Sequence, residues 1–100
     1  FYLVSAVGNF SKYGAAASYV GIKIVVTVNN SAYNTRAESY NYIPDVASAY
    51  GCIMSRCLVD VTDTSNVKVG FNITSSATVQ LYGHSSNNAT HFMFQRVGDT

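Results

Sequence analysis

The chain has 100 residues, of which 48% are hydrophobic and only 11% are charged, and its formal net charge is +1. This length fits one domain with a single core. So small a net charge excludes a protein that binds DNA, RNA or anionic lipid through its electrostatic field. The composition also excludes a coiled coil and a disordered tail, and the surface is kept polar by 12 Ser, 8 Thr and 9 Asn.

Apolar side chains at every second position predict strands with one buried face. The even positions from 20 to 28 are all aliphatic, so Val28 is expected to face inward with them, and the odd positions from 67 to 73 are apolar. Residues 51–61 are apolar on both faces, which predicts a central strand covered on both sides. The strands expected in chain order cover residues 1–7, 19–28, 36–42, 51–61, 66–74, 78–82 and 91–97.

Turn residues separate these segments, beginning with Gly8 and Asn9. Residues 12–18 contain three consecutive alanines, but a single helical turn is too short to change the fold class. Strands that recur every ~10 to 15 residues are typical of antiparallel sandwiches. We therefore expect an all-β antiparallel jelly-roll sandwich of about seven strands. Residues 1–100 form one domain on this reading, and the opening Phe1 is compatible with the C-terminal part of a longer chain.

Cys52 and Cys57 lie five positions apart on one expected strand. An extended strand would separate their Cα atoms by ~16 Å and direct their side chains to opposite faces. They are therefore not expected to bond to each other, because a disulfide needs Cα atoms within ~7 Å. Each is either a free core thiol, the reading we favour, or paired with another chain. Free thiols favour folding in a reducing compartment.

The candidate chemical groups do not support catalysis. The two histidines, His84 and His91, have no run of Cys, Asp or Glu nearby to complete a metal site. Glu38 is the one glutamate, so a pair of carboxylates would need tertiary proximity to an aspartate. No nucleophile elbow, phosphate loop or dinucleotide fingerprint occurs. We expect no enzymatic activity, no cofactor and no metal.

Tyrosines alternate with amides and hydroxyls in residues 29–45. This combination is typical of recognition surfaces, because tyrosine gives contact area at low entropy cost and short amides adapt to sugars or proteins. A subunit interface or a sheet edge packed on its own core is the alternative, and it stays open. The loop at residues 83–88 is a second candidate, with a flexible turn as its alternative. The candidate ligand-binding residues are Tyr33, Asn34, Arg36, Tyr40, Tyr42, His84 and Asn87.

The last third of the chain resembles a known family. Residues 67–71 and 78–83 are followed by a polar loop and then by Thr-His-Phe-Met-Phe-Gln-Arg-Val-Gly-Asp-Thr. This order resembles the end of tumour-necrosis-factor-like and complement-type globular-head jelly rolls. The final run is similar to the C-termini of bacteriophage tail-fibre and related virion surface proteins, and residues 21–30 are similar to a mid-domain strand and turn of that fold. The family's first strands are missing or shortened here.

The resemblance implies a homotrimer that binds partners with its outer loops. The expected function is that of a non-enzymatic virion surface domain, assembled in the host cytoplasm and extracellular when mature. It would be a tail-fibre tip that binds a host-surface glycan or protein, without nucleic acid or membrane insertion. One alternative is a capsid decoration protein of the same fold. The other is a secreted lectin-like module, for which Asn9, Asn29, Asn72 and Asn88 head four glycosylation sequons.

Overall fold

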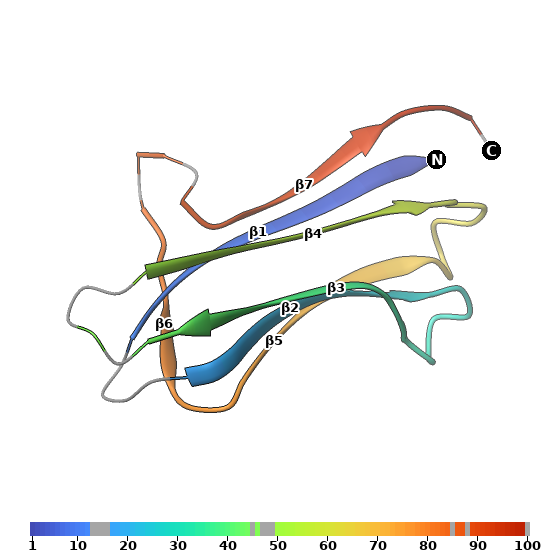
Figure 1. Cartoon of the computed structure of the whole chain (residues 1–100). Helices are drawn as coiled ribbons and strands as arrows, with labels where there is room; N and C mark the ends of the chain where they lie inside the picture. The colour runs from blue at the N-terminus through green and yellow to red at the C-terminus, as the bar shows by residue number, and fades with distance from the viewer. Residues whose placement is uncertain (13–16, 45, 47–49, 85, 88, 100) are drawn as a thin grey trace.

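A computed structural model describes residues 1–12, 17–44, 46, 50–84, 86–87 and 89–99, and these residues form an all-β protein (Figure 1). Within these residues, seven strands form two antiparallel sheets, so the expected all-β fold and strand number of about seven are confirmed. Among the residues described, no helix is long and apolar enough to cross a membrane. The strands are β1 (Tyr2–Lys12), β2 (Ala17–Thr27), β3 (Asn34–Ile43), β4 (Tyr50–Val59), β5 (Lys68–Ser75), β6 (Val79–Leu81) and β7 (His91–Arg96).

The two sheets lie face to face with the core between them (Figure 1). In the four-stranded sheet, β4 pairs with one edge of β1, and β7 and then β6 pair with its other edge. In the three-stranded sheet, β2 lies between β3 and β5. The side chains buried between the sheets include Val4, Ala6, Phe10, Val20, Ile22, Ile24, Val26, Ile43, Ile53 and Val59.

The alternation read in β2 is confirmed up to the end of the strand. Val20, Ile22 and Ile24 are fully buried, and Val26 is nearly so. Val28 was expected to continue this row, and that expectation is wrong, because β2 ends at Thr27 and Val28 lies exposed in the bend that follows. The Thr27 hydroxyl is buried and accepts the N–H groups of Asn29 and Ser31, which turns the chain away from the sheet.

The turn expected at Gly8 and Asn9 is wrong, because β1 continues through both residues to Lys12. Gly8 belongs to the inward row of β1, where a Cβ atom would lie only 2.7 Å from Cε2 of Phe10. Glycine here makes room for a buried ring. The helical turn considered for residues 12–18 is not found at its described ends, which are strand, and its middle lies outside the described residues.

Asn9 lies on β1 between the segment that pairs with β7 and the segment that pairs with β6. Its carbonyl accepts the N–H of Tyr82 at 2.7 Å, and its own N–H donates to Oγ1 of Thr90 at 3.1 Å. The Asn9 side-chain amide donates to the Ala89 carbonyl, and the Thr90 hydroxyl donates to the Tyr82 carbonyl. The chain leaves the sheet after β6 and returns at β7, and these bonds hold both points to β1.

The expectation that residues 51–61 form a central, doubly covered strand is wrong. In the part of the chain that the structure describes, β4 pairs with β1 alone and forms an edge of its sheet. Its inward side chains Ile53 and Ser55 are buried, and the Ser55 hydroxyl donates to the Ile22 carbonyl at 3.0 Å across the core. Its outward side chains Met54 and Leu58 are exposed. The second apolar row is therefore a surface feature.

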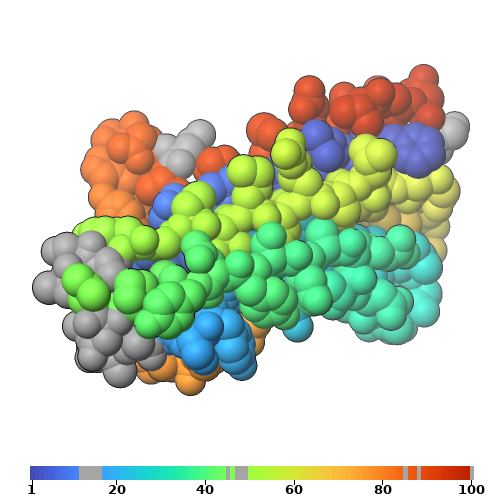
Figure 2. Space-filling view, viewed as in Figure 1, coloured from blue at the N-terminus to red at the C-terminus, as the bar shows by residue number. Residues whose placement is uncertain are grey.

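β3 and β4 close one side of the sandwich. Figure 2 shows these two strands in contact along the face turned to the viewer. The Asn41 side-chain amide donates to the Cys52 carbonyl at 3.2 Å. Gly51 lies against Ile43, since a Cβ at Gly51 would be 2.6 Å from Cδ1 of Ile43.

Candidate functional site

Three tyrosines gather on the outer face of the three-stranded sheet. Tyr40 and Tyr42 are two positions apart on β3 and therefore share a face. Tyr19 on β2 meets the Tyr40 ring edge to face, with ring centroids 6.1 Å apart. The Tyr40 ring lies over Gly21, where a Cβ would be 2.5 Å from Cε1 of that ring. Glycine in a strand lets a neighbouring aromatic ring cover the backbone, which explains how Tyr40 is held.

Tyr33 extends this surface toward β5, because a Cβ at Gly70 would lie 3.9 Å from Cε1 of Tyr33. The turn before it is built by Asn29, whose side-chain oxygen accepts the N–H of Ala32 at 2.9 Å. Asn30 has a φ of 63°, the left-handed conformation that asparagine tolerates well. This turn places Tyr33 next to the sheet just before β3 begins.

Charged and amide groups lie on the same surface. Lys23 pairs with Glu38 on β3 and with Asn72 on β5. The Tyr40 hydroxyl donates to the Glu38 carboxylate at 3.5 Å. Exposed rings beside adaptable polar groups suit contacts with sugars or proteins. We call this surface the tyrosine face, and it consists of Tyr19, Tyr33, Tyr40 and Tyr42 with Lys23, Glu38 and Asn72.

Two of the sequence candidates on β3 do not join the tyrosine face. Asn34 is the first residue of β3 and pairs with Val26, whose side chain is buried in the core. Paired residues share a face of the sheet, so Asn34 lies on the inner face and not on the tyrosine face. Arg36 is the extra residue of a bulge, because Ala37 pairs with Ile24 while Thr35 pairs with Val25. Arg36 lies instead on the β4 side, in a cavity of about 230 Å³ lined also by Val26, Val28, Val59, Asp60 and Thr62.

His84 and Asn87 lie away from the tyrosine face, both exposed in the chain that follows β6, and His84 belongs to a second aromatic group there. The His84 ring lies beside Tyr82, with centroids 6.4 Å apart, and Tyr82 meets Tyr50 edge to face at 6.2 Å. Tyr50 and Tyr82 were not among the predicted site residues. Tyr50 precedes the expected strand at 51–61, and Tyr82 ends the expected strand at 78–82. They line a hollow of about 510 Å³ with Ser11, Gln80, Leu81 and Gly83.

Apolar side chains gather on the outer face of the four-stranded sheet, where Arg56, His91 and Gln95 also lie. Leu3 on β1 pairs with Leu58 on β4, and Val7 pairs with Met54. Met93 on β7 pairs with the small residue Ser5 between them. Leu58 is 62% exposed, and Met54 and Met93 are each about half exposed. We call this surface the apolar face, and it consists of Leu3, Val7, Met54, Leu58 and Met93.

The two cysteines are unpaired, as expected, but their burial differs. Cys52 is exposed on the outer side of β4, so its assignment as a core thiol is wrong. Cys57 is partly buried on the inner side, where burial raises the pKa of its thiol and the nearby Arg36 guanidinium lowers that pKa by less.

The raised pKa of Cys57 predicts slow alkylation, because the thiolate is the nucleophile. In a Cys52→Ser variant, iodoacetamide should label Cys57 more slowly than the cysteine of the blocked peptide acetyl-Gly-Cys-Gly-amide at pH 8. Its rate should keep rising with pH after that of the blocked peptide has levelled off. Mass spectrometry of quenched samples measures both rates. Equal rates and equal pH profiles would contradict this description of Cys57.

The described residues provide no cluster of three or more His, Cys, Asp or Glu side chains that could hold a metal ion. The tyrosine face is an open surface of exposed rings and polar side chains. Comparison with protein-family models, with curated proteins and with solved structures found no match to this chain.

Proposed function

We propose that this chain is a non-enzymatic virion surface domain: the jelly-roll tip of a trimeric bacteriophage tail fibre that binds a host-surface glycan or protein. The observation that carries the proposal is the contrast between the two outer faces of the sandwich. One is a cluster of aliphatic and methionine side chains in which Met54, Leu58 and Met93 are exposed and Leu3 and Val7 are partly buried, and the other combines tyrosines with polar groups. Such a division suits a domain that assembles through one sheet and recognises a partner through the other.

The strand arrangement supports the jelly-roll part of the proposal. Two antiparallel sheets face each other, and the chain passes between them after β1, after β3, after β4 and after β5. Strands that alternate between two packed sheets are the arrangement of Greek-key and jelly-roll domains. The C-terminal Phe-x-Phe-x-Arg-Val-Gly-Asp run, which resembles those of tail-fibre proteins, ends β7 and continues past it.

The apolar face supports the homotrimer. Exposed apolar side chains that adjoin across paired strands mark an association surface. Among the described outward side chains of β1, β4 and β7, Arg56 is the one with a formal charge at pH 7. Interfaces are depleted in charge but often retain arginine. Three copies packed through this face would cover Leu58 and Met54 and leave the tyrosine face outward.

Recognition through the tyrosine face would act by avidity. Three copies of a weak site on one trimer bind a multivalent cell surface far more tightly than one site does. The free thiols suit a protein made in a reducing cytoplasm. The low charge and hydroxyl-rich composition suit exposure outside the cell.

Replacing Tyr42 with alanine tests the tyrosine face. The Tyr42 side chain is exposed, so we expect the free energy of unfolding to change by less than about 0.5 kcal/mol. If the ring contacts a ligand, binding should weaken roughly tenfold or more. Binding to a glycan array and to a panel of bacterial cells would be measured against wild type. The matched control is Tyr50→Phe, which keeps the ring of the second aromatic group.

Unchanged binding by both Tyr42→Ala and Tyr33→Ala would contradict the assignment of the tyrosine face. The apolar face also fits a second function, capsid decoration, because a trimer could clamp neighbouring capsid subunits. Immunogold labelling of virions separates the two: label at the tail tip supports the fibre, and label over the capsid faces supports decoration.

A further inference from the structure

The sandwich is closed on one side and open on the other. β3 and β4 meet on the closed side through the Asn41 to Cys52 hydrogen bond. The opposite side is bounded by β5 and β7. In the described residues, β5 pairs with β2 alone and β7 with β1 alone, so each strand leaves one edge without a strand partner.

Large apolar side chains on the inward faces of β5 and β7 are exposed to an unusual degree for core-facing positions. Phe92 pairs with Ala6 and Phe94 with Val4, both fully buried, which places these rings on the inner face of their sheet. Yet Phe92 is 44% exposed and Phe94 is 53% exposed. Ile73 on β5, opposite buried Ile22, is 41% exposed. Core-facing residues this exposed indicate that the core lacks a cover on this side.

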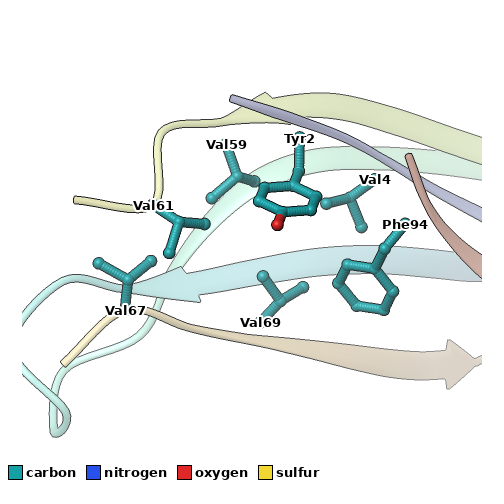
Figure 3. A pocket seen from close by; sticks show the side chains of 7 residues that line it. All are labelled: Tyr2, Val4, Val59, Val61, Val67, Val69 and Phe94. Carbon is teal, nitrogen blue, oxygen red and sulfur yellow. The ribbon is translucent and has the colours of Figure 1, made fainter. Parts of the chain in front are cut away.

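Aromatic contacts are what joins the two sheets at the open side. The Phe71 ring of β5 stacks on Phe92 with centroids 4.2 Å apart, and it meets Phe94 edge to face at 5.9 Å. Toward one end of the sandwich this contact gives way to a cavity of about 240 Å³ (Figure 3). Its walls are uncharged and come from both sheets: Tyr2, Val4, Val59, Val61, Val67, Val69 and Phe94.

The same strands present hydrogen-bonding groups at their open edges. The Val97 N–H donates to the Phe1 carbonyl at 3.0 Å. In an antiparallel ladder alternate residues bond to the same neighbour, so residues 91, 93 and 95 face β1. Phe92 and Phe94 therefore direct their backbone N–H and C=O groups away from β1, at the positions where their rings are half exposed.

We propose that this open side accepts one extended β-strand supplied in trans by another polypeptide, which pairs with the free edge of β7 and inserts aliphatic side chains beside Phe92, Phe94 and the Val69 cavity. Only an extended segment can pair its backbone with the free N–H and C=O groups of this edge. The uncharged lining requires apolar side chains on every second residue of that segment. With β7 spanning six residues, the added strand needs about six as well.

A second copy of this chain fits the open side less well. The inward aromatic side chains of its β5 and β7 edges are already engaged with each other. Among its other described edge strands, β3 and β4 close the opposite side of the sandwich, and β6 spans only three residues. A second copy would therefore bring no aliphatic row to the cavity at Val69. This inference is independent of the proposed trimer, because the apolar face lies on the outer side of the same sheet.

The test uses the whole 100-residue chain and two synthetic peptides. The probe is acetyl-Lys-Thr-Val-Thr-Val-Thr-Val-Thr-Lys-amide with a fluorescent label, and its control carries N-methyl groups on the three valines. Hydrogen exchange of the free chain should show unprotected amides at Phe92 and Phe94. Saturating probe should slow both amides by about tenfold or more, while the N-methylated control should leave them unchanged.

Variants locate the binding site. Phe94→Glu should weaken probe binding about tenfold or more in fluorescence anisotropy, because it places a charge in the apolar row. The matched control Leu58→Glu alters the opposite face of the same sheet and should bind as wild type does, and circular dichroism checks that both variants fold. The proposal is overturned if the Phe92 and Phe94 amides are already protected at low concentration, or become protected only as protein concentration rises. It is also overturned if the probe does not bind, or binds Phe94→Glu equally.

Discussion

Replacing Phe10 with alanine is expected to destabilise the domain by about 3–5 kcal/mol, the usual cost of removing a large ring from a packed core. Phe10 is fully buried and among the largest such side chains in the core. It sits where β1 pairs with β4 on one side and β6 on the other, opposite Gly51 and Leu81. Small domains have free energies of unfolding of about 5–15 kcal/mol, so this loss would remove a large part of the total stability.

Chemical denaturation at one fixed protein concentration measures the effect, since stability depends on concentration when a protein assembles. The matched control is Phe1→Ala, which removes the same ring from a position that is 41% exposed. It should cost about 1 kcal/mol or less. If the two variants lost the same stability, Phe10 would not lie in the core as described.

Replacing Leu58 with lysine is expected to dissociate the proposed trimer while leaving the fold intact. Leu58 projects from β4 into the apolar face, and its exposure in the single chain means that the substitution buries nothing during folding. In an assembled interface the added charge would be buried without a partner, beside the existing charge of Arg56. That costs about 3–5 kcal/mol per subunit, enough to shift an assembly to monomers.

Val28→Lys is the matched control, because Val28 is as exposed as Leu58 but lies in the bend after β2. Sedimentation velocity should show monomers for Leu58→Lys and an unchanged assembly for Val28→Lys. An identical sedimentation profile for Leu58→Lys and wild type would exclude the apolar face as the interface.

The strands and most of the core could be predicted because the alternation is strong where one face is buried. In β2 the aliphatic positions 20 to 26 are the buried ones. Prediction failed where a small residue serves packing: Gly8 was read as a turn, but it makes room for the Phe10 ring inside β1. It failed again in β4, where apolar residues on both faces indicated burial and Met54 and Leu58 are exposed. Composition does not distinguish a strand covered by a second layer from one whose outer apolar row is exposed.

The candidate site was predicted in part. Tyr40 and Tyr42 were named as candidates, and their two-residue spacing on β3 places them on one face. The face on which Arg36 lies could not be predicted, because Arg36 is the extra residue of a bulge in β3, opposite Ile24 and Val25. No turn residue in the sequence marks that bulge. Tyr19 was missed, although Gly21 two positions later signals a strand backbone that a neighbouring ring can cover.

Assembly through the apolar face is the claim on which the proposed function depends most. Sedimentation equilibrium of the wild-type chain at about 10 µM tests it most directly, because this method measures the mass of the assembly whatever its shape. The proposal predicts the mass of three chains, falling toward one chain only on strong dilution. A mass of one chain throughout the micromolar range would contradict it.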